Sequence, residues 1–100
     1  MTLPVVLLEA AKRDIAHEKS YYNAKRQGLG DAFLLEVQAT ITRISWWPEM
    51  YQKANGHPHL RRAVLHRFPF AVGYRIFSDF IEVVGVFPAR GDPHRLFQRL

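Results

Sequence analysis

The chain has 100 residues, of which 48% are hydrophobic and 23% charged, with a formal net charge of +5 and no cysteine. This length fits a single domain over residues 1–100, the composition is too apolar for a disordered chain, and no apolar run approaches the ~20 residues that span a bilayer. Without cysteine the chain has no disulfide scaffold, thiol nucleophile or cysteine-ligated metal site, and we expect a reducing, cytoplasmic setting.

The positive charge is confined to the second half of the chain. Residues 1–50 carry six basic and six acidic side chains, whereas residues 51–100 carry eight basic and three acidic ones. Seven of those eight basic residues are arginines, whose guanidinium groups suit bidentate contacts with phosphates and carboxylates. This distribution predicts a polyanion or an acidic protein as partner; the alternative is a basic surface that serves only solubility.

The first half of the chain predicts a strand and then two helices. Residues 3–8 are aliphatic and β-branched, and Pro4 favours an edge or strand-entry position for this strand. Helix-forming residues follow from 9 to 26, and a Gly-x-Gly sequence lets the chain reverse into a second helix over 30–47. The second helix is indicated by an apolar stripe, and Pro48 ends it. The stripe consists of Phe33, Val37, Ile41 and Ile44.

After a loop over residues 49–59 the hydrophobic period changes to two. We expect strands over 60–66, 70–77 and 80–87, followed by a turn and a short helical tail. The order β-α-α-β-β-β predicts an α+β fold in which a helical hairpin packs on one face of a small, mainly antiparallel sheet.

Residue types needed for metal or cofactor chemistry are sparse. His57 and His59 have an alternate spacing, but Pro58 lies between them in a polar loop and no third ligand is near in sequence, whereas zinc takes three or four protein ligands. Gly28-x-Gly30 joins a helix to a helix, unlike a phosphate-binding loop, which joins a strand to a helix. We expect neither a metal nor a cofactor.

Basic side chains of the second half could act on phosphate. Strand alternation would place Arg61 and Arg67 on one face of their strand and Arg62 and His66 on the other. A histidine could move a proton to or from a 2′-hydroxyl while arginines stabilise the charge that develops on phosphorus, so RNA cleavage without metal is conceivable. In the alternative, these arginines only bind phosphate or an acidic partner.

Aromatic residues near the end of the second helix admit two interpretations. Trp46 and Trp47 could form a platform for stacked bases or an anchor for a partner chain. In the other interpretation, one tryptophan caps the core where helix meets sheet and the other is half exposed.

Several motifs, taken in order, resemble the RelE/ParE superfamily of bacterial toxins. The helical half carries Asp14-Ile15, Tyr21-Tyr22 and Gly28-Leu29-Gly30-Asp31, and the sheet half carries Arg67-Phe68-Pro69-Phe70 and Arg90-x-Asp92-Pro93. The resemblance covers about residues 3–95. It implies the same β-α-α-β-β-β fold and a small cytoplasmic toxin of a type II toxin–antitoxin pair. Such a toxin inhibits growth in stress responses and is neutralised by a cognate antitoxin.

The resemblance also bears on the target, because the family contains mRNA endonucleases and gyrase inhibitors. Nuclease members carry an arginine just before the strand that here reads Val72-Gly-Tyr74, and they commonly end in a functional tyrosine. This chain has Phe70-Ala71 before that strand and no tyrosine after Tyr74. We therefore expect a ParE-like toxin that inhibits DNA gyrase by binding. The alternatives are a RelE-like, ribosome-dependent mRNA endonuclease and an inactive remnant that keeps only antitoxin binding.

The resemblance and the basic constellation together give the candidate site residues. Under the nuclease alternative the catalytic groups are Arg61, Arg62, His66 and Arg90. Contacts to the target or to phosphate would come from Arg67, Arg90, His94 and Arg95. Both a homodimer and a toxin–antitoxin hetero-oligomer are compatible with the sequence.

Overall fold

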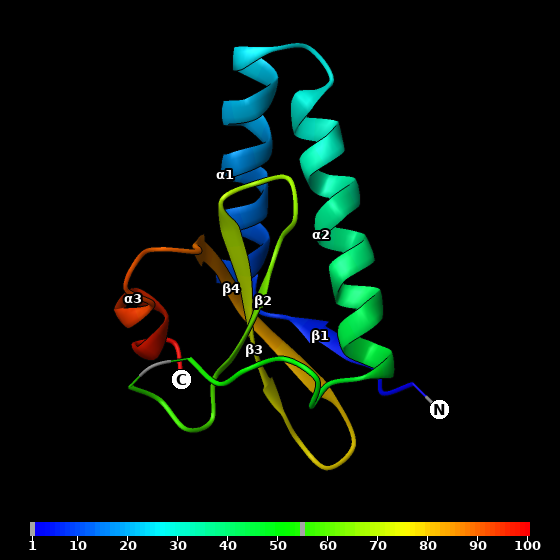
Figure 1. Cartoon of the computed structure of the whole chain (residues 1–100), viewed down its shortest axis with the longest axis vertical. Coiled ribbons are helices and arrows are strands. Elements are labelled where there is room, and N and C mark those ends of the chain that lie inside the picture. The colour runs from blue at the N-terminus through cyan, green and yellow to red at the C-terminus, as the bar shows by residue number, and fades with distance from the viewer. Residues whose placement is uncertain (1, 55) are drawn as a thin grey trace.

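The computed structural model describes residues 2–54 and 56–100 and contains one four-stranded sheet. In spatial order the strands are β1 (Val5–Leu7), β4 (Ile81–Pro88), β3 (Phe70–Ile76) and β2 (Arg61–Val64). β1 runs parallel to β4, and the other neighbouring pairs are antiparallel. Figure 1 shows β1 entering the sheet beside the last long strand, although the two are distant in sequence.

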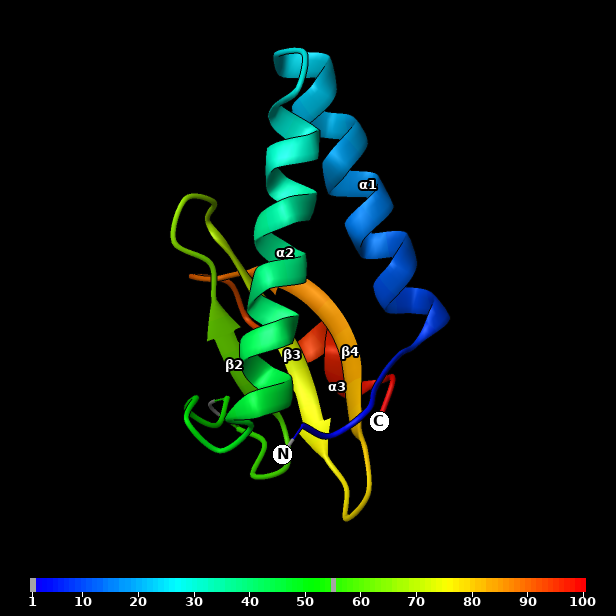
Figure 2. The ribbon, with the colours of Figure 1, turned by 90° about the vertical axis from the view of Figure 1, so that its right-hand side faces the viewer.

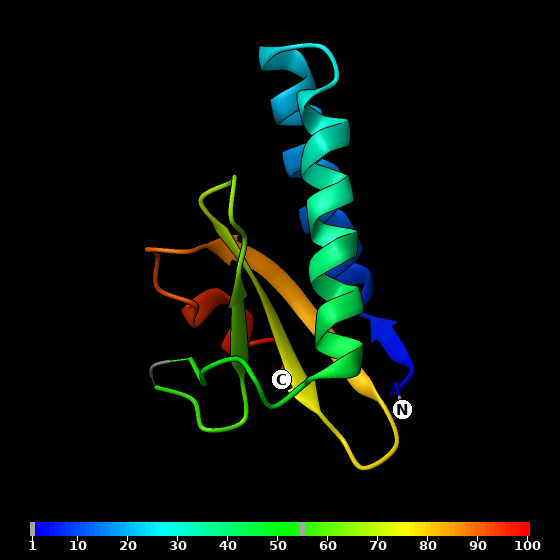
Figure 3. The ribbon, with the colours of Figure 1, turned by 45° about the vertical axis from the view of Figure 1, so that its right-hand side comes forward.

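Helices cover both faces of this sheet. α1 (Glu9–Lys25) and α2 (Leu29–Trp46) form an antiparallel hairpin on one face, which extends well beyond the end of the sheet. A short helix, α3 (His94–Phe97), lies on the opposite face, as Figure 2 and Figure 3 show from the side. We call these the hairpin face and the tail face. No helix in the described part of the chain is long and apolar enough to cross a membrane.

The tight turn of the helical hairpin depends on two glycines. Gly28 has a φ of +87°, a left-handed conformation that side chains disfavour. Gly30 lies against α1, where its N–H donates to Asn23 Oδ1 at 2.6 Å and a Cβ would overlap the carbonyl oxygen of Lys19. The Gly-x-Gly sequence thus both reverses the chain and lets the two helices approach closely.

The hairpin face is held by large apolar side chains. Phe33, Val37 and Ile44 of the predicted stripe are buried, and aromatic rings of Tyr22, Phe68 and Phe70 surround the ring of Phe33. Ile41, expected to share this burial, is only partly buried, because it borders a groove between the two helices. Three of the four residues of the predicted stripe are therefore buried, and the fourth is not.

The tail face combines a smaller apolar cluster with an ion pair. Its buried members are Ala54, Leu60, Ala71, Val84, Phe87 and Leu96. Beside them, Asp14 of α1 accepts bonds from Arg99 Nη1 at 2.7 Å and Nη2 at 3.1 Å. Arg99 also donates to the Val84 carbonyl at 3.0 Å, and the Val86 N–H donates to Asp14 at 3.0 Å. These contacts fasten the C-terminal segment to α1 and to β4.

The predicted fold class, element order and two helices are confirmed, but two strands are shorter than expected. β1 spans Val5–Leu7 instead of residues 3–8. β2 ends at Val64 rather than at residue 66. The Glu36 carboxylate accepts the backbone N–H groups of His66 and Arg67, and this draws the chain away from the sheet into a turn. The predicted alternation of Arg61 with Arg67 and of Arg62 with His66 is therefore wrong, because the strand does not extend that far.

Candidate functional site

The two neighbouring arginines of β2 lie on opposite faces of the sheet. Arg61 lies opposite Tyr74, a buried residue of the hairpin-face core, whereas Arg62 lies opposite Gly73, where an added Cβ would overlap Leu96 of the tail face. Arg61 Nη1 donates to the carbonyl oxygens of residues 51 and 49, at 2.7 and 3.3 Å. Arg62 Nη2 donates to the carbonyl of Ala89. The strand therefore separates two groups that the sequence places side by side.

Most of the other candidates lie at one end of the sheet. His66 and Arg67 are exposed in the turn between β2 and β3, and the guanidinium of Arg67 lies 5.6 Å from the ring centroid of Phe68. The Ala89 N–H donates to the Pro69 carbonyl at 3.0 Å, which brings the segment after β4 beside this turn. Arg90 is exposed in that segment. Arg62, His66, Arg67 and Arg90 are thus the basic residues around this end, which we call the Arg90 end.

The remaining two candidates belong to α3. His94 and Arg95 are exposed, and Arg95 Nη2 donates to the Val86 carbonyl at 3.3 Å. The His94 ring lies 5.8 Å from that of Phe97, edge to face. These residues lie on the tail face of the sheet, and their exposure leaves them free to contact a partner.

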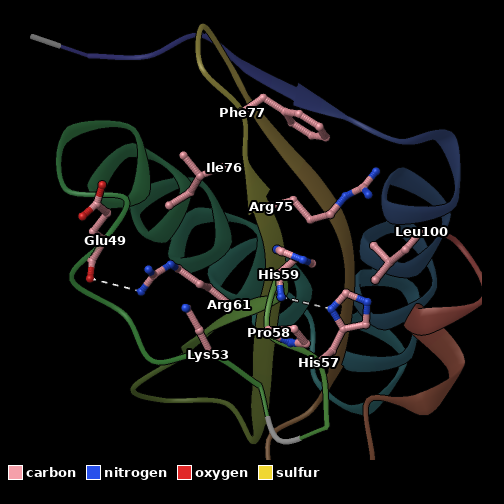
Figure 4. Close-up of a pocket in the computed structure, with 10 residues that line it drawn as sticks. All are labelled: Glu49, Lys53, His57, Pro58, His59, Arg61, Arg75, Ile76, Phe77 and Leu100. Atoms are coloured by element: carbon pink, nitrogen blue, oxygen red, sulfur yellow. Dashed lines mark hydrogen bonds between the residues drawn. The ribbon is translucent and has the colours of Figure 1, made fainter.

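Arg61 faces a groove that sequence reasoning did not assemble. The groove encloses about 580 Å³ beyond the start of β2, and Figure 4 shows the residues that line it. Its basic members are Lys53, His57, His59, Arg61 and Arg75. They come from the loop before β2, from β2 and from β3, so no short motif contains them. We call this the Lys53 groove.

The charges of the Lys53 groove are unequally compensated. Arg75 is paired with Glu82, with Nη2–Oε1 and Nε–Oε1 distances of 2.6 and 2.9 Å. Lys53 and Arg61 are directly opposed across an isolated β-bridge. Within residues 2–54 and 56–100 neither of these two cations forms an ion pair with a carboxylate. Glu49 also lines this side of the groove, so two cations and one carboxylate leave a net positive charge there.

The histidine pair of the loop lies in the same groove. The His59 backbone N–H donates to His57 Nδ1 at 3.2 Å, and the two ring centroids are 5.9 Å apart. In the part of the chain that the structure describes, no three His, Cys, Asp or Glu side chains are grouped so as to hold a metal ion. The groove therefore combines two imidazole rings with the cations of Lys53 and Arg61.

Both tryptophans at the end of α2 are exposed. Trp46 and Trp47 retain 49% and 58% of their accessible surface, and their ring centroids are 6.1 Å apart. The interpretation in which one of them caps the core is therefore wrong. The core position at this end of α2 is taken by Tyr74, whose hydroxyl donates to the Pro48 carbonyl at 2.5 Å. Burial raises the pKa of this hydroxyl above its ordinary value, and the nearby Arg61 partly opposes that effect.

Comparison with known proteins rests on structure. No protein-family model matches the sequence, and no curated protein matches it significantly. Among the solved structures that match, three do so over nearly their whole length at low sequence identity. The chromosomal ParDE toxin–antitoxin system from P. aeruginosa has a TM-score of 0.66 at 15% identity, covering 87% of this chain and 96% of that one.

The other two structures are toxin RelE and a RelBE complex. E. coli toxin RelE, solved in the free state as a double arginine-to-alanine mutant, has a TM-score of 0.68 at 13% identity, with 99% of this chain and 94% of that one covered. The toxin–antitoxin complex RelBE2 from Mycobacterium tuberculosis has a TM-score of 0.61 at 14% identity, with coverages of 88% and 99%. The chain therefore has the RelE/ParE toxin fold, as the sequence motifs implied.

Proposed function

We propose that the protein is the toxin of a type II toxin–antitoxin pair and that it acts in the ParE-like manner, by binding DNA gyrase. The observation that carries the toxin assignment is the match of the whole fold to ParDE, RelE and RelBE2 structures. Fold alone does not define function, so the choice of target has to come from the residues around the sheet.

The absence of the nuclease arginine before β3 favours binding over cleavage, even though three of the four nuclease candidates lie together at the Arg90 end. Cleavage of RNA requires an acid–base group and charge-stabilising groups around one phosphate. Arg61 lies in the Lys53 groove, while Arg62, His66 and Arg90 lie at the Arg90 end. Phe70 and Ala71 also occupy the position where nuclease relatives have an arginine. An exposed basic surface with two exposed tryptophans suits the recognition of a large partner.

A groove on the hairpin offers a docking surface for the antitoxin. It encloses about 290 Å³ between α1, α2 and β1, and its apolar lining consists of Leu7, Ile15, Ala16, Leu34, Val37 and Ile41. Lys12 and Lys19 border it. An apolar groove edged by lysines fits an amphipathic helix with acidic residues on its flanks. We assign this groove to a helix of the cognate antitoxin.

The target assignment is tested with purified protein in two assays. We expect inhibition of supercoiling by gyrase from the source organism and no new RNA ends in a translating extract. The contrary result is ribosome-dependent cleavage by the wild-type chain that is lost in Arg90→Ala, since removing one charge-stabilising group lowers a rate by about 10²–10³. Arg26→Ala, which removes an exposed arginine at the far end of α1, is the matched control.

The antitoxin assignment is tested with a charge placed in the groove. Ala16 is exposed within it, so Ala16→Glu should leave the fold intact. We expect binding to the product of the neighbouring reading frame to weaken at least about tenfold, because the new carboxylate would lose its hydration on binding. Ala24→Glu, at an exposed position of the same helix outside the groove, should bind as the wild type does. Equal affinities of the two variants would place the antitoxin elsewhere.

A further inference from the structure

The Lys53 groove contains a like-charge arrangement that the rest of the fold does not explain. Residues opposed across a β-bridge have Cβ atoms about 4.5–5.5 Å apart, and like charges at such positions are destabilising. Lys53 and Arg61 occupy such positions. Arg61 is held by backbone carbonyls, which accept its N–H groups without removing its charge. An anion between the two cations would convert this repulsion into attraction.

The nearest acidic side chains do not supply that anion. Glu49 lines the groove, but its backbone carbonyl, not its carboxylate, accepts the bond from Arg61 (Figure 4). Glu82 is engaged by Arg75. Lys53 is exposed, and its amine makes no hydrogen bond within the described residues. The positive charge of the groove is thus available to an external ligand.

The opposite side of the groove adds neutral donors and flat surfaces. Figure 4 places Lys53 and Arg61 on the side of Glu49, and His57 and His59 toward Leu100. Because His57 Nδ1 accepts the His59 N–H, the proton of the neutral imidazole resides on Nε2, where it can be donated to a ligand. Imidazole rings and guanidinium planes are surfaces on which unpaired bases stack.

We propose that the Lys53 groove binds a nucleotide unit, with its phosphate between Lys53 and Arg61 and its base against the imidazoles of His57 and His59. A volume of about 580 Å³ exceeds what an isolated phosphate or a carboxylate side chain would fill, and it lies within the ~300–1,000 Å³ typical of small-molecule sites. A phosphate also offers more acceptor oxygens than a carboxylate to the several donors present. The site is separate from the Arg90 end and does not depend on the proposed toxin activity.

The test measures binding of a fluorescein-labelled, single-stranded oligouridine to the purified chain over a series of salt concentrations. Each phosphate contact with a single strand contributes about 0.7 to the slope of log affinity against log salt. We expect Lys53→Gln to make this slope shallower by about 0.7 and Lys53→Arg, which keeps the charge, to retain it. Lys25→Gln removes the same charge at the far tip of the hairpin and should leave the slope unchanged.

Competition experiments identify the source of the nucleotide. Displacement of the probe by UMP assigns the groove to free nucleotides, and displacement only by unlabelled oligouridine assigns it to a strand; either result supports the proposal. In both cases the amide resonances of Lys53, His59 and Arg61 should shift on binding. The proposal is overturned if Lys53→Gln and Lys25→Gln change the slope equally, if oligouridine does not bind, or if an oligoglutamate peptide binds more tightly than oligouridine.

Discussion

The two faces of the sheet are stabilised in different ways. On the hairpin face, two long helices bury Phe33, Val37 and Ile44 against β3 and β4, and aromatic rings fill the space between helix and sheet. On the tail face, a four-residue helix covers a smaller cluster and is fastened by the ion pair between Asp14 and Arg99. The helical hairpin is held on the sheet by buried apolar area, whereas the C-terminal segment is held by a few hydrogen bonds and one ion pair.

This difference implies different responses to perturbation. Loss of apolar volume on the hairpin face should destabilise the whole domain, because helices and sheet share one core. Loss of the ion pair on the tail face should release the C-terminal segment locally before the domain unfolds. Three substitutions, in order of decreasing expected effect, test whether the faces behave in this way.

Phe33→Ala should have the largest effect. Phe33 is fully buried and contacts Tyr22, Phe68 and Phe70, and removing such a ring typically costs about 3–5 kcal/mol of unfolding free energy. Urea denaturation followed by circular dichroism measures the change. Leu35→Ala, at a residue of the same helix that is 66% exposed, is the control and should stay within about 0.5 kcal/mol of the wild type.

Asp14→Asn should have an intermediate and partly local effect. The change removes a charge whose side chain is only 13% exposed and which accepts bonds from Arg99 and from the Val86 N–H. We expect a loss of about 1–3 kcal/mol, with hydrogen exchange in residues 94–99 accelerated more than exchange in α2. Arg13→Gln, at the exposed neighbouring position, should change neither. Uniform acceleration across the domain would show that the tail face is as cooperative as the hairpin face.

Tyr74→Phe should have the smallest effect, and its size should depend on pH. At neutral pH the variant loses the hydroxyl bond to the Pro48 carbonyl, at a cost of about 1 kcal/mol. Burial raises the pKa of Tyr74 above its ordinary value of 10.0, so this hydroxyl's contribution is complete below pH 10.0 and is lost as the pH rises further. The stability difference between wild type and variant should therefore narrow above pH 10.0. A gap that widens there would contradict the assigned burial effect.

The fold could be predicted because its signals are local. The spacing of Phe33, Val37 and Ile44 indicates α2, and Gly28 and Gly30 mark the turn before it. Alternating residues indicate β3 and β4. The end of β2 was mispredicted because it is set by Glu36, a residue of α2 that captures the backbone of His66 and Arg67. Such contacts between distant segments produce no hydrophobic periodicity in the sequence, so they could not be predicted from it.

The candidate site was less accessible to sequence reasoning for the same reason. The basic surplus of the second half is visible in composition, but its division between the Arg90 end and the Lys53 groove follows from side-chain direction within β2. In the sequence, the spacing of His57 and His59 suggests only a metal pair. No motif links these histidines to Lys53 or Arg75, which line the same groove. The β-bridge between Lys53 and Arg61 forms only in the folded chain, so the sequence alone does not reveal it.

The parallel pairing of β1 with β4 has a consequence for the order of events during synthesis. β1 and the helical hairpin leave the ribosome first, but Val5 and Leu7 pair with residues 81 and 83. Until β4 emerges, β1 has no partner and the apolar face of α2 has no sheet to cover it. Closing so long a segment is slow compared with forming a helix. The nascent chain therefore forms its helices well before the sheet that buries their apolar face is complete.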